Sequence, residues 1–425
     1  NEDILLEKVQ GLDPEQRAAV EEINEYARKV KMFEMRPTDN PRPKPKLLLV
    51  HGNAGTGKSH VIDIASQLAH KTFAFNSSGH DPDHPYILKL AFTGSAADLI
   101  GGQTIHKALG LPCNNSAVPL GDKMRDLRRI QLKELKMIFI DEISLVGADT
   151  IYQIHFRLSK EIKQNCKDFG GCAMVFFGDQ LQIKPVSNTF NFGVPTNPKF
   201  AMADSINRLW DKFQRIELKT NHRSGEFREY AEILNNLRIG QLTTGDIEKL
   251  ESRVFPRTSK DIPSDAIFVS GENAIVNEYN KRKLNEPDTD LVSSKANVFS
   301  ATQREIKTPK LDSSGYIHIT NIPLVVDLKV RARITLTYNI DVSDSLCNGS
   351  LGDVVGFKRD NNNGIKYVMV KFDKLSAGSE RRKNNKFLES EFGYATPIDL
   401  LEQEYHQGKE SSSSATAINW PLKLA

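Results

Sequence analysis

The chain has 425 residues, of which 39% are hydrophobic and 26% charged, and its formal net charge is +3 at pH 7. This length predicts about three domains, and the small net charge leaves a polyanionic partner open, because local basic patches can bind one. No apolar run is long enough to cross a bilayer, and the four cysteines lack metal-ligand spacing. We therefore expect a soluble intracellular protein with free thiols and no membrane partner.

A polar, Pro-rich stretch at 36–46 separates an N-terminal helical segment from the first apolar run. Within the helical segment, LDPEQRAAV (12–20) places Gln16 at a helix start that Asp13 can cap. A glutamine amide offers both a hydrogen-bond donor and an acceptor. Gln16 is therefore a candidate for binding the edge of an adenine ring.

The apolar run LLLV (47–50) is followed by GNAGTGKS, which has the G-x-x-x-x-G-K-S spacing of a phosphate-binding loop, and then by apolar residues at helical spacing. Such a loop points its backbone amides at phosphate oxygens from the start of a helix. Lys58 is expected to neutralise charge on the β- and γ-phosphates, and Ser59 to bind Mg²⁺. The residues predicted to bind the cofactor ATP are Gln16, Gly55, Thr56, Gly57, Lys58 and Ser59.

Three further apolar runs alternate with helical stretches, as expected for strands buried on both faces of a parallel sheet. They are residues 86–92, 137–140 and 173–177. The second of these runs continues directly into Asp141 and Glu142. A carboxylate at such a strand end can hold Mg²⁺ and its water shell, and a second one can orient the attacking water. We therefore predict that Asp141 binds the metal together with Ser59, that Glu142 acts as the general base, and that the chain hydrolyses nucleoside triphosphates.

Two polar residues further along are candidates for completing the phosphate site. FFGDQLQIKPV (176–186) places Gln182 beside the expected γ-phosphate, whose loss it could report. LKTNHRS (218–224) places Arg223 just after the first strand of a second α/β unit, and an arginine from a second domain can stabilise charge on the transferring phosphoryl group. Taken alone, each could be an ordinary surface residue. The predicted catalytic residues are Lys58, Asp141, Glu142, Gln182 and Arg223.

The chain is expected to contain two α/β units and a β-rich insertion. The second unit begins near RIELKT (215–220) and continues with AIFVS (266–270) and a helix. From about residue 290, short β-rich pieces separated by Gly and Asn turns predict a small barrel or sheet. The expected boundaries are 1–205 for the N-terminal segment and first unit, with a short insertion at 107–136, then 206–290 for the second unit, 291–410 for the β-rich insertion and 411–425 for a strand returning to the second unit.

In this order, the motifs resemble those of a superfamily-1B DNA helicase of the petite-integration-frequency (Pif) family, a relative of RecD and of the helicases of Helitron transposons. The matching segments are LDPEQ, GNAGTGKS, AFTGSAADLIGGQTIHKALG, IDEISLV, GDQLQIKPV, TNHRS and LCNGSLGDVV. The resemblance implies an α/β fold, with two RecA-like parallel-sheet domains of a P-loop NTPase and a small β-rich insertion. It also implies that ATP and Mg²⁺ bind between the two domains, and that hydrolysis drives movement along single-stranded DNA from 5′ to 3′.

The resemblance also indicates residues that face DNA. TGSAADLIGGQTIHK (93–107) matches the family's single-strand-binding element, and its glycines let the backbone approach a ligand closely. Thr93, Thr104 and His106 are expected to contact phosphate or sugar, although Thr104 and His106 are equally well explained as structural groups. The basic segment 122–136 matches a small wedge region and is expected to contact phosphates. The expected partners are single-stranded DNA and DNA junctions, the expected state is a monomer, and the expected compartment in a eukaryote is the nucleus.

Family members continue beyond a PLKLA-like strand into segments resembling HKSQG and ALSR, which supply further DNA contacts and a second arginine finger, whereas this sequence ends at Ala425. The second RecA-like domain is therefore expected to be incomplete. Either the sequence is a piece of a longer protein, or it is a naturally degenerate copy. On this basis the chain is expected to bind ATP and single-stranded DNA, to hydrolyse ATP poorly and not to unwind DNA.

Two other classes of protein remain open. A nucleotide kinase would need a small acceptor and would ignore DNA, and the motifs GDQLQ and TNHRS argue against it. A module that binds single strands without turning over ATP is the other alternative. Phosphate release that is stimulated by nucleic acid would separate the three classes.

Overall fold

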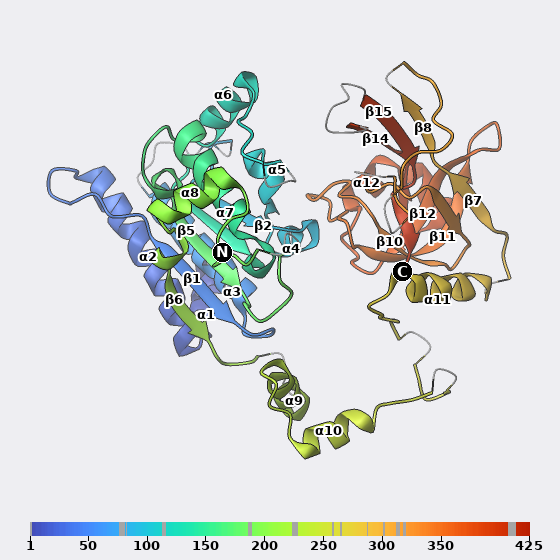
Figure 1. Cartoon of the computed structure of the whole chain (residues 1–425), viewed down its shortest axis with the longest axis horizontal. Helices are drawn as coiled ribbons and strands as arrows, with labels where there is room; N and C mark the ends of the chain where they lie inside the picture. Colours follow the sequence, from blue (N-terminus) through green and yellow to red (C-terminus); the bar gives the residue numbers. More distant parts are fainter. Residues whose placement is uncertain are drawn as a thin grey trace. The chain divides into compact units, whose positions relative to one another are not determined.

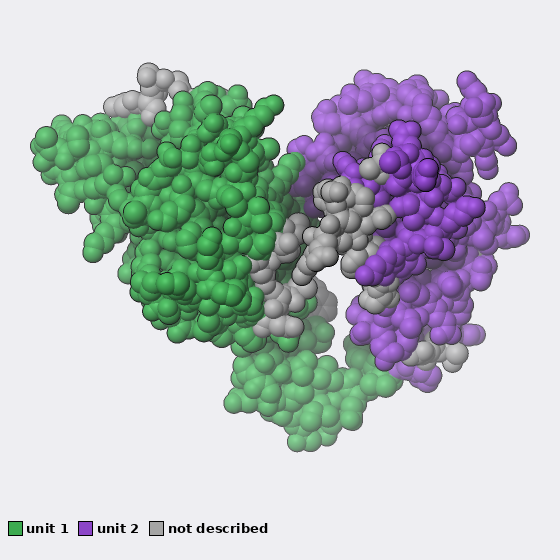
Figure 2. Space-filling model, turned by 45° about the horizontal axis from the view of Figure 1, so that its top comes forward, with its two compact units in different colours: residues 1–254 green, residues 255–425 purple. Residues whose placement is uncertain are grey.

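The structure is a computed structural model that describes residues 2–75, 81, 83–112, 116–185, 189–222, 228–256, 259–263, 266–286, 288–300, 302–311, 315–317, 320–406 and 414–425. The chain forms two compact units, unit 1 with residues 1–254 and unit 2 with residues 255–425 (Figure 1, Figure 2). Among the helices in these ranges, none is both long enough and apolar enough to cross a bilayer.

Unit 1 is built on a six-stranded sheet with the strand order β3-β2-β4-β5-β1-β6, in which every pairing is parallel (Figure 1). Its strands are β1 (Leu47–Gly52), β2 (Ile87–Ala91), β3 (Gln103–Thr104), β4 (Met137–Asp141), β5 (Ala173–Gly178) and β6 (Gln214–Leu218). All residues of β4 and β5 are buried, as expected for the central strands of a parallel sheet covered on both faces. The sheet predicted from the apolar runs is therefore confirmed.

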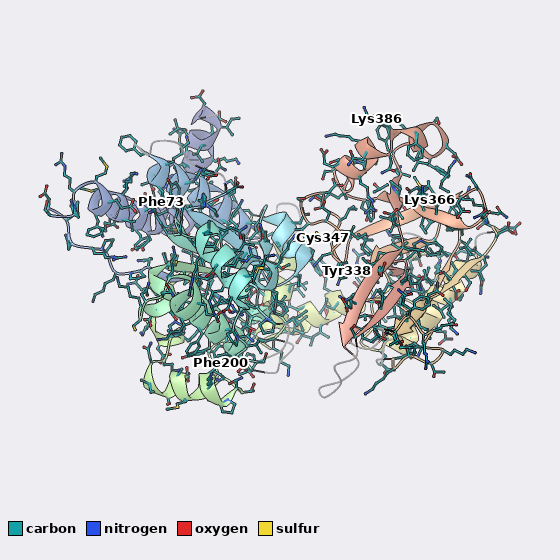
Figure 3. All side chains as sticks on the ribbon, turned by 90° about the horizontal axis from the view of Figure 1, so that it is seen from above. Phe73, Phe200, Tyr338, Cys347, Lys366 and Lys386 are labelled. Carbon is teal, nitrogen blue, oxygen red and sulfur yellow. The ribbon has the colours of Figure 1, made fainter. Side chains whose placement is uncertain are left out.

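Helices cover both faces of this sheet. On one face, α7 and α8 pack against alternate strand residues such as Ile140 and Phe176, and Phe200 of α8 is fully buried there (Figure 3). Helices α2 and α3 pack against each other, and Phe73 of α3 is fully buried (Figure 3). The helices of unit 1 are α1 (Glu2–Gln10), α2 (Pro14–Met35), α3 (Lys58–Ala74), α4 (Gly94–Leu99), α5 (Ile105–Leu109), α6 (Asp122–Gln131), η1 (Ile143–Leu145), α7 (Ala148–Phe156), the π-helical η2 (Arg157–Ile162), η3 (Asp168–Gly171), α8 (Pro198–Ile206), η4 (Trp210–Lys212), α9 (Arg228–Arg238) and α10 (Thr244–Glu251).

One strand joins a different sheet from the one the sequence pattern predicts. The pattern places residues 215–220 at the start of a second α/β unit. In the structure β6 is instead the edge strand of the first sheet, parallel to β1, with Ile216 opposite Val50. Only Leu218 of β6 is buried. The prediction that this strand begins a second sheet was therefore wrong. The sequence of a short strand with one buried residue does not indicate which strand it pairs with.

Unit 2 consists mainly of antiparallel strands. They form a five-stranded sheet (β13-β12-β11-β10-β16), a three-stranded sheet (β14-β15-β8) and a two-stranded sheet (β7-β9). The strands are β7 (Val292–Lys295), β8 (Asn297–Ser300), β9 (Val325–Leu328), β10 (Arg333–Leu336), β11 (Leu351–Arg359), β12 (Ile365–Phe372), β13 (Thr396–Ile398), β14 (Leu401–His406), β15 (Ser414–Asn419) and β16 (Leu422–Leu424). The helices are α11 (Asn273–Asn285), α12 (Ser379–Asn384), η5 (Lys386–Leu388) and α13 (Glu389–Phe392).

Two segments that were expected to form strands of the second α/β unit do not do so. Residues 266–270 form no strand. Residues 411–425 are expected to return toward the second unit, but β15 pairs with β14 and β8, and β16 pairs with β10. Within the described part of unit 2, every strand pairing is therefore antiparallel. The reason is again that strand propensity is local, whereas strand partners are chosen by the tertiary fold.

Candidate functional site

The phosphate-binding loop lies where β1 ends and α3 begins. Gly55 and Gly57 have φ angles of 86° and 77°, a left-handed backbone that residues with a side chain rarely adopt. A Cβ atom on Gly57 would also lie 2.5 Å from Nε2 of Gln16. Glycine at these positions therefore permits the turn that directs the first amides of α3 toward a phosphate.

Gln16 is placed beside this loop by the cap of α2. Its backbone amide donates a 2.8 Å hydrogen bond to Oδ1 of Asp13, and its Oε1 accepts a 3.3 Å hydrogen bond from the amide of Asp13, which together form a capping box. Gln16 is buried, and its Nε2 donates to the carbonyl oxygen of Thr56 at 3.0 Å. The structure thus brings Gln16 to the loop, where its amide holds the loop backbone. Its contact with adenine stays a prediction.

The ammonium group of Lys58 is held over the loop. Its Nζ donates to the carbonyl oxygens of Gly52 at 2.8 Å and Asn53 at 2.9 Å. Partial burial lowers the pKa of Lys58, and nearby carboxylates oppose this effect. A bound triphosphate would favour the charged form in the same way. Ser59, the next residue, is partly exposed in the first turn of α3.

Two adjacent carboxylates lie at the end of β4, where Asp141 is its last residue and Glu142 follows it. Asp141 is buried, and its Oδ1 accepts a 2.9 Å hydrogen bond from the backbone amide of Glu142. Burial raises the pKa of Asp141 to about 6, and the charge of Glu142 adds to this rise. Glu142 has φ 53° and ψ 47°, a left-handed conformation that is uncommon for a residue with a long side chain. Such strain is concentrated at functional sites. The metal-binding role of Asp141 and the general-base role of Glu142 stay predictions.

Replacing Asp141 by asparagine is expected to stabilise the protein at neutral pH. Because the pKa of Asp141 is raised from 3.8 to about 6, the folded chain holds this proton more tightly than the unfolded chain. Ionised Asp141 therefore destabilises the fold above about pH 6, and this penalty disappears as the pH falls toward about 4. Asp141→Asn should raise the free energy of unfolding by about 2–3 kcal/mol near pH 7.5, and by progressively less below about pH 6. Urea unfolding of both proteins without Mg²⁺ measures the difference, and equal stabilities near pH 7.5 would contradict it.

The turn after β5 forms another part of the site. Asp179 is buried and forms an ion pair with Arg238 of α9, and its Oδ1 accepts a 3.0 Å hydrogen bond from the backbone amide of Leu181. The backbone amide of Gln182 donates to the carbonyl oxygen of Asp179 at 3.1 Å. The Gln182 side chain is exposed. Its predicted role as a sensor of the γ-phosphate stays a prediction.

The segment after β6 contributes contacts that the sequence did not predict. The ion pair of Arg238 with Asp179 is one of these contacts. The backbone amide of His222 donates to the carbonyl oxygen of Gly55 at 2.8 Å. Oδ1 of Asn235 accepts a 2.8 Å hydrogen bond from Nδ2 of Asn53. Arg223, the predicted arginine finger, lies outside the described residues. No sequence signal identifies Asn235 or Arg238, because both lie on an ordinary amphipathic helix.

Comparison with known proteins identifies the family. Residues 38–248 match the family model described as PIF1-like helicase. The chain is also 26% identical over 310 residues to the ATP-dependent DNA helicase PIF1 of Saccharomyces cerevisiae (strain YJM789), a match that covers 72% of this chain and 33% of that protein. This chain belongs to the PIF1-like helicase family. It spans 33–40% of the length of four such curated relatives.

Solved structures of Pif1 helicases have the same fold. The crystal structure of Pif1 helicase from Candida albicans matches with a TM-score of 0.63 and 22% identity, covering 97% of this chain and 84% of that chain. Pif1 helicase from Bacteroides in complex with ADP-AlF3 and ssDNA matches with a TM-score of 0.58 and 22% identity, covering 93% of this chain and 81% of that chain. These matches confirm the predicted α/β class.

In this PIF1-like helicase chain, the residues predicted to bind DNA have structural partners. Oγ1 of Thr93 caps α4 by accepting from the amide of Ala96 at 3.2 Å, and Oγ1 of Thr104 caps α5 by accepting from the amide of Lys107 at 3.4 Å. His106 is partly buried, which lowers its pKa, and it lies edge-on to Phe92 with ring centroids 5.5 Å apart. The three residues thus shape the element, and their contact with DNA stays a prediction.

In helix α6 of this PIF1-like helicase chain, basic side chains face the protein and do not form a free basic surface. One terminal nitrogen of Arg128 donates to the carbonyl oxygen of Lys107 at 2.9 Å, and Nε of Arg129 donates to the carbonyl oxygen of Glu161 at 2.7 Å. These arginines are partly buried, whereas three apolar side chains of the helix are exposed. They are Met124, Leu127 and Ile130. The expected phosphate contacts therefore have fewer free side chains than the composition of 122–136 indicates.

Proposed function

We propose that this chain carries the ATP site of an ATP-dependent DNA helicase, whose hydrolysis of Mg-ATP drives movement along single-stranded DNA from 5′ to 3′. The observation that carries the proposal is the convergence of three groups at the ends of three neighbouring parallel strands. Lys58 follows β1, Asp141 ends β4 and is followed by Glu142, and the Asp179 turn follows β5. Parallel strands bring their carboxyl ends to one edge of a sheet, where nucleotides bind.

The residues at this edge have the chemistry that Mg-ATP hydrolysis requires. The hydroxyl of Ser59 and the carboxylate of Asp141 are the hard oxygen ligands that Mg²⁺ prefers. The raised pKa of Asp141 also fits a cation site, because a bound cation would stabilise the buried negative charge. When bound, Mg²⁺ would neutralise charge on the phosphates. Lys58 would neutralise further phosphate charge, and Glu142 would orient the attacking water and accept its proton.

Single-stranded DNA and DNA junctions are the partners that this proposal requires, and we propose that the protein acts as a monomer. The Bacteroides Pif1 helicase has been solved with ssDNA, and its fold is similar to that of this chain. The exposed Lys123 and Lys133 on either side of the α6 arginines remain available for phosphates.

Phosphate release with and without DNA is the experiment that decides the function. The chain with Mg-ATP is expected to release phosphate faster when a mixed-sequence single strand is added. Lys58→Ala is the control, because loss of the ammonium group should weaken ATP binding by about tenfold or more. Turnover that requires a small acceptor and ignores DNA would indicate a nucleotide kinase. The absence of any release, with single-strand binding retained, would indicate a module that does not hydrolyse ATP.

Binding of single strands is expected to depend on salt and not on sequence. Contacts to phosphate and sugar carry no sequence information, and each neutralised phosphate releases counterions. For about five phosphate contacts, affinity should fall by roughly 10²-fold between 50 and 200 mM salt, whatever the base sequence. Fluorescence anisotropy with mixed-sequence and homopolymer strands at both salt concentrations measures this. Strong sequence preference with little salt dependence would contradict a motor that moves along the backbone.

A further inference from the structure

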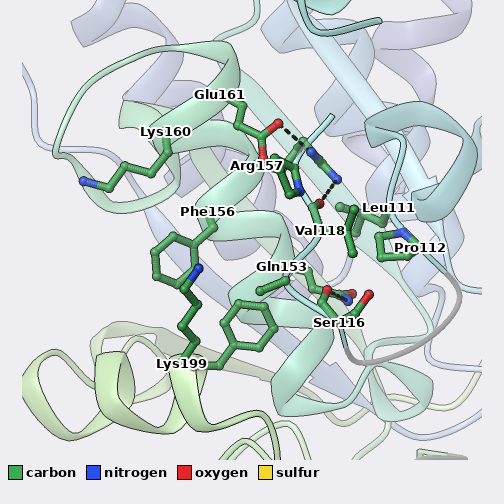
Figure 4. A pocket seen from close by; sticks show the side chains of 13 residues that line it. Leu111, Pro112, Ser116, Val118, Gln153, Phe156, Arg157, Lys160, Glu161 and Lys199 are labelled. Atoms are coloured by element: carbon green, nitrogen blue, oxygen red, sulfur yellow. Dashed lines mark hydrogen bonds and ion pairs between the residues drawn. The ribbon is translucent and has the colours of Figure 1, made fainter. Parts of the chain in front are cut away.

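A pocket of about 380 Å³ opens on unit 1, and it shares no residue with the nucleotide site. It lies between α7 and η2 on one side and residues 111–112 and 116–119 on the other (Figure 4). Figure 4 shows Gln153, Phe156 and Arg157 on the helical side, and Leu111, Pro112 and Val118 on the loop side. Most of its lining is apolar, and the volume is in the range of pockets that bind small molecules or single side chains.

Most polar groups in the pocket wall are bonded to the protein, whereas Nε of Arg157 is buried and has no hydrogen-bond partner among the described residues. A terminal nitrogen of Arg157 donates to Glu161 at 2.7 Å, and the other donates to the carbonyl oxygen of Val118 at 3.2 Å (Figure 4). The second nitrogen also donates to the carbonyl oxygen of Gly110 at 3.0 Å. Gln153 donates to the carbonyl oxygen of Ser116 at 2.9 Å. A nucleobase placed here would leave its ring nitrogens and amino groups without enough partners, which costs binding free energy. The interior therefore fits a hydrocarbon or phenyl group better than a base.

The mouth of the pocket is positively charged. Lys160 and Lys199 line the pocket and are exposed, and within the described residues no acidic partner is found for either ammonium group. Among the described residues that line the pocket, only Glu161 is acidic, and it is engaged by Arg157 and by the backbone amide of Leu120 at 2.7 Å. Lys160 lies on the π-helical η2, and short π-helical segments are frequent at functional sites.

We propose that this pocket binds a partner protein through an acidic peptide segment that inserts one leucine or phenylalanine side chain. The apolar lining accepts the side chain, and the two lysines at the mouth attract the flanking carboxylates. Residues 111–112 and 116–119 lie in the chain between α5 and α6, so the partner would contact the described part of the connection between the predicted single-strand element and the wedge helix. This inference does not depend on ATP hydrolysis by the chain.

Binding of three labelled peptides to the full chain tests the proposal. The probe is a fluorescein-labelled peptide of sequence DDEFLDD, and its controls are DDESSDD, which lacks the apolar side chains, and KKRFLKK, which reverses the charge. Fluorescence anisotropy should show that the probe binds about tenfold or more tightly than either control, because burial of one apolar side chain and two charge contacts each contribute. Equal binding of DDEFLDD and DDESSDD would overturn the proposal.

Variants then locate the site. The double charge reversal Lys160→Glu/Lys199→Glu should weaken binding of the probe by about tenfold or more. The matched control is Lys44→Glu/Lys167→Glu, which makes the same charge change at exposed lysines outside the pocket and should bind like the parent. All positions are exposed, so both variants are expected to fold, and thermal unfolding of each checks this. An equal loss of affinity in both variants would overturn the proposal, because it would indicate attraction by net charge alone.

Two further measurements keep the proposal open to refutation. A version of the probe with a photo-reactive leucine should crosslink to residues 111–112, 116–119 and 153–161, as mapped by mass spectrometry, and crosslinks confined to other regions would overturn the assignment. Oligo-thymidylate is added as a competitor. If it displaced the probe from the parent and protected the pocket residues from crosslinking, the pocket would be a nucleic-acid site and the proposal would be wrong.

Discussion

Replacing Glu142 by glutamine is expected to slow DNA-stimulated ATP hydrolysis by about 10²-fold or more, the scale on which a general base contributes. Glu142 stands next to the buried Asp141, in a left-handed conformation that the fold maintains despite its energetic cost. Glutamine keeps the size of the side chain and its hydrogen-bonding oxygen but cannot accept the proton of the attacking water. We predict that the loop amides and Lys58 carry the affinity for ATP, which is therefore expected to stay near that of the parent.

Single-turnover phosphate release and fluorescent-nucleotide titration separate these two effects. The matched control is Glu134→Gln, which makes the same substitution at an exposed glutamate just before β4. The control should hydrolyse ATP at the parental rate. Hydrolysis by Glu142→Gln at the parental rate would show that another group activates the water.

Replacing Arg238 by methionine is expected to lower the free energy of unfolding of unit 1 by about 3 kcal/mol. Methionine preserves much of the aliphatic length of arginine but removes the charge that pairs with Asp179. The side chain of Asp179 is 3% exposed and that of Arg238 is 18% exposed, so the carboxylate would be left buried without its cation. The cost arises from this unpaired charge, and not from the loss of an ion pair as such. Urea unfolding followed by circular dichroism measures it.

Two variants distinguish this explanation from a general loss of packing. Arg208→Met removes the cation of an exposed pair with Asp211, whose Nε and Oδ2 atoms are 3.5 Å apart, and should change stability by less than about 0.5 kcal/mol. The double variant Asp179→Asn/Arg238→Met should recover part of the lost stability, because no buried charge remains. An Arg238→Met protein as stable as the parent would contradict the assigned role. That result would mean that Asp179 is stabilised without α9.

Local sequence was sufficient for the features that depend on short-range geometry. The phosphate loop requires two left-handed glycines and a lysine at a fixed spacing, and the structure places Gly55, Gly57 and Lys58 accordingly. The capping box at Asp13 and Gln16 is likewise a relation between residues three positions apart. Buried strands read as continuous apolar runs, so β4 and its two terminal carboxylates were also predictable.

The direction of the basic side chains on α6 was not predictable in this way. Composition counts the arginines but does not show which face of the helix meets the protein. In the structure, backbone carbonyl oxygens of Lys107 and Glu161 accept hydrogen bonds from Arg128 and Arg129, and the exposed face carries apolar residues. Carbonyl oxygens are present in every segment, so a sequence pattern cannot indicate which of them will be reached.

The sequence by itself determined the phosphate loop, the acidic end of β4, the cap of α2 and the family, because each rests on residue types at fixed separations along the chain. The tertiary structure alone decided that β6 joins the first sheet, that β15 and β16 complete antiparallel sheets, and that Arg238 reaches Asp179 across 59 positions. A strand edge or a buried charge interacts with the group that the folded chain brings next to it. Which group that is depends on the packing of the whole core, and it cannot be read from positions along the sequence.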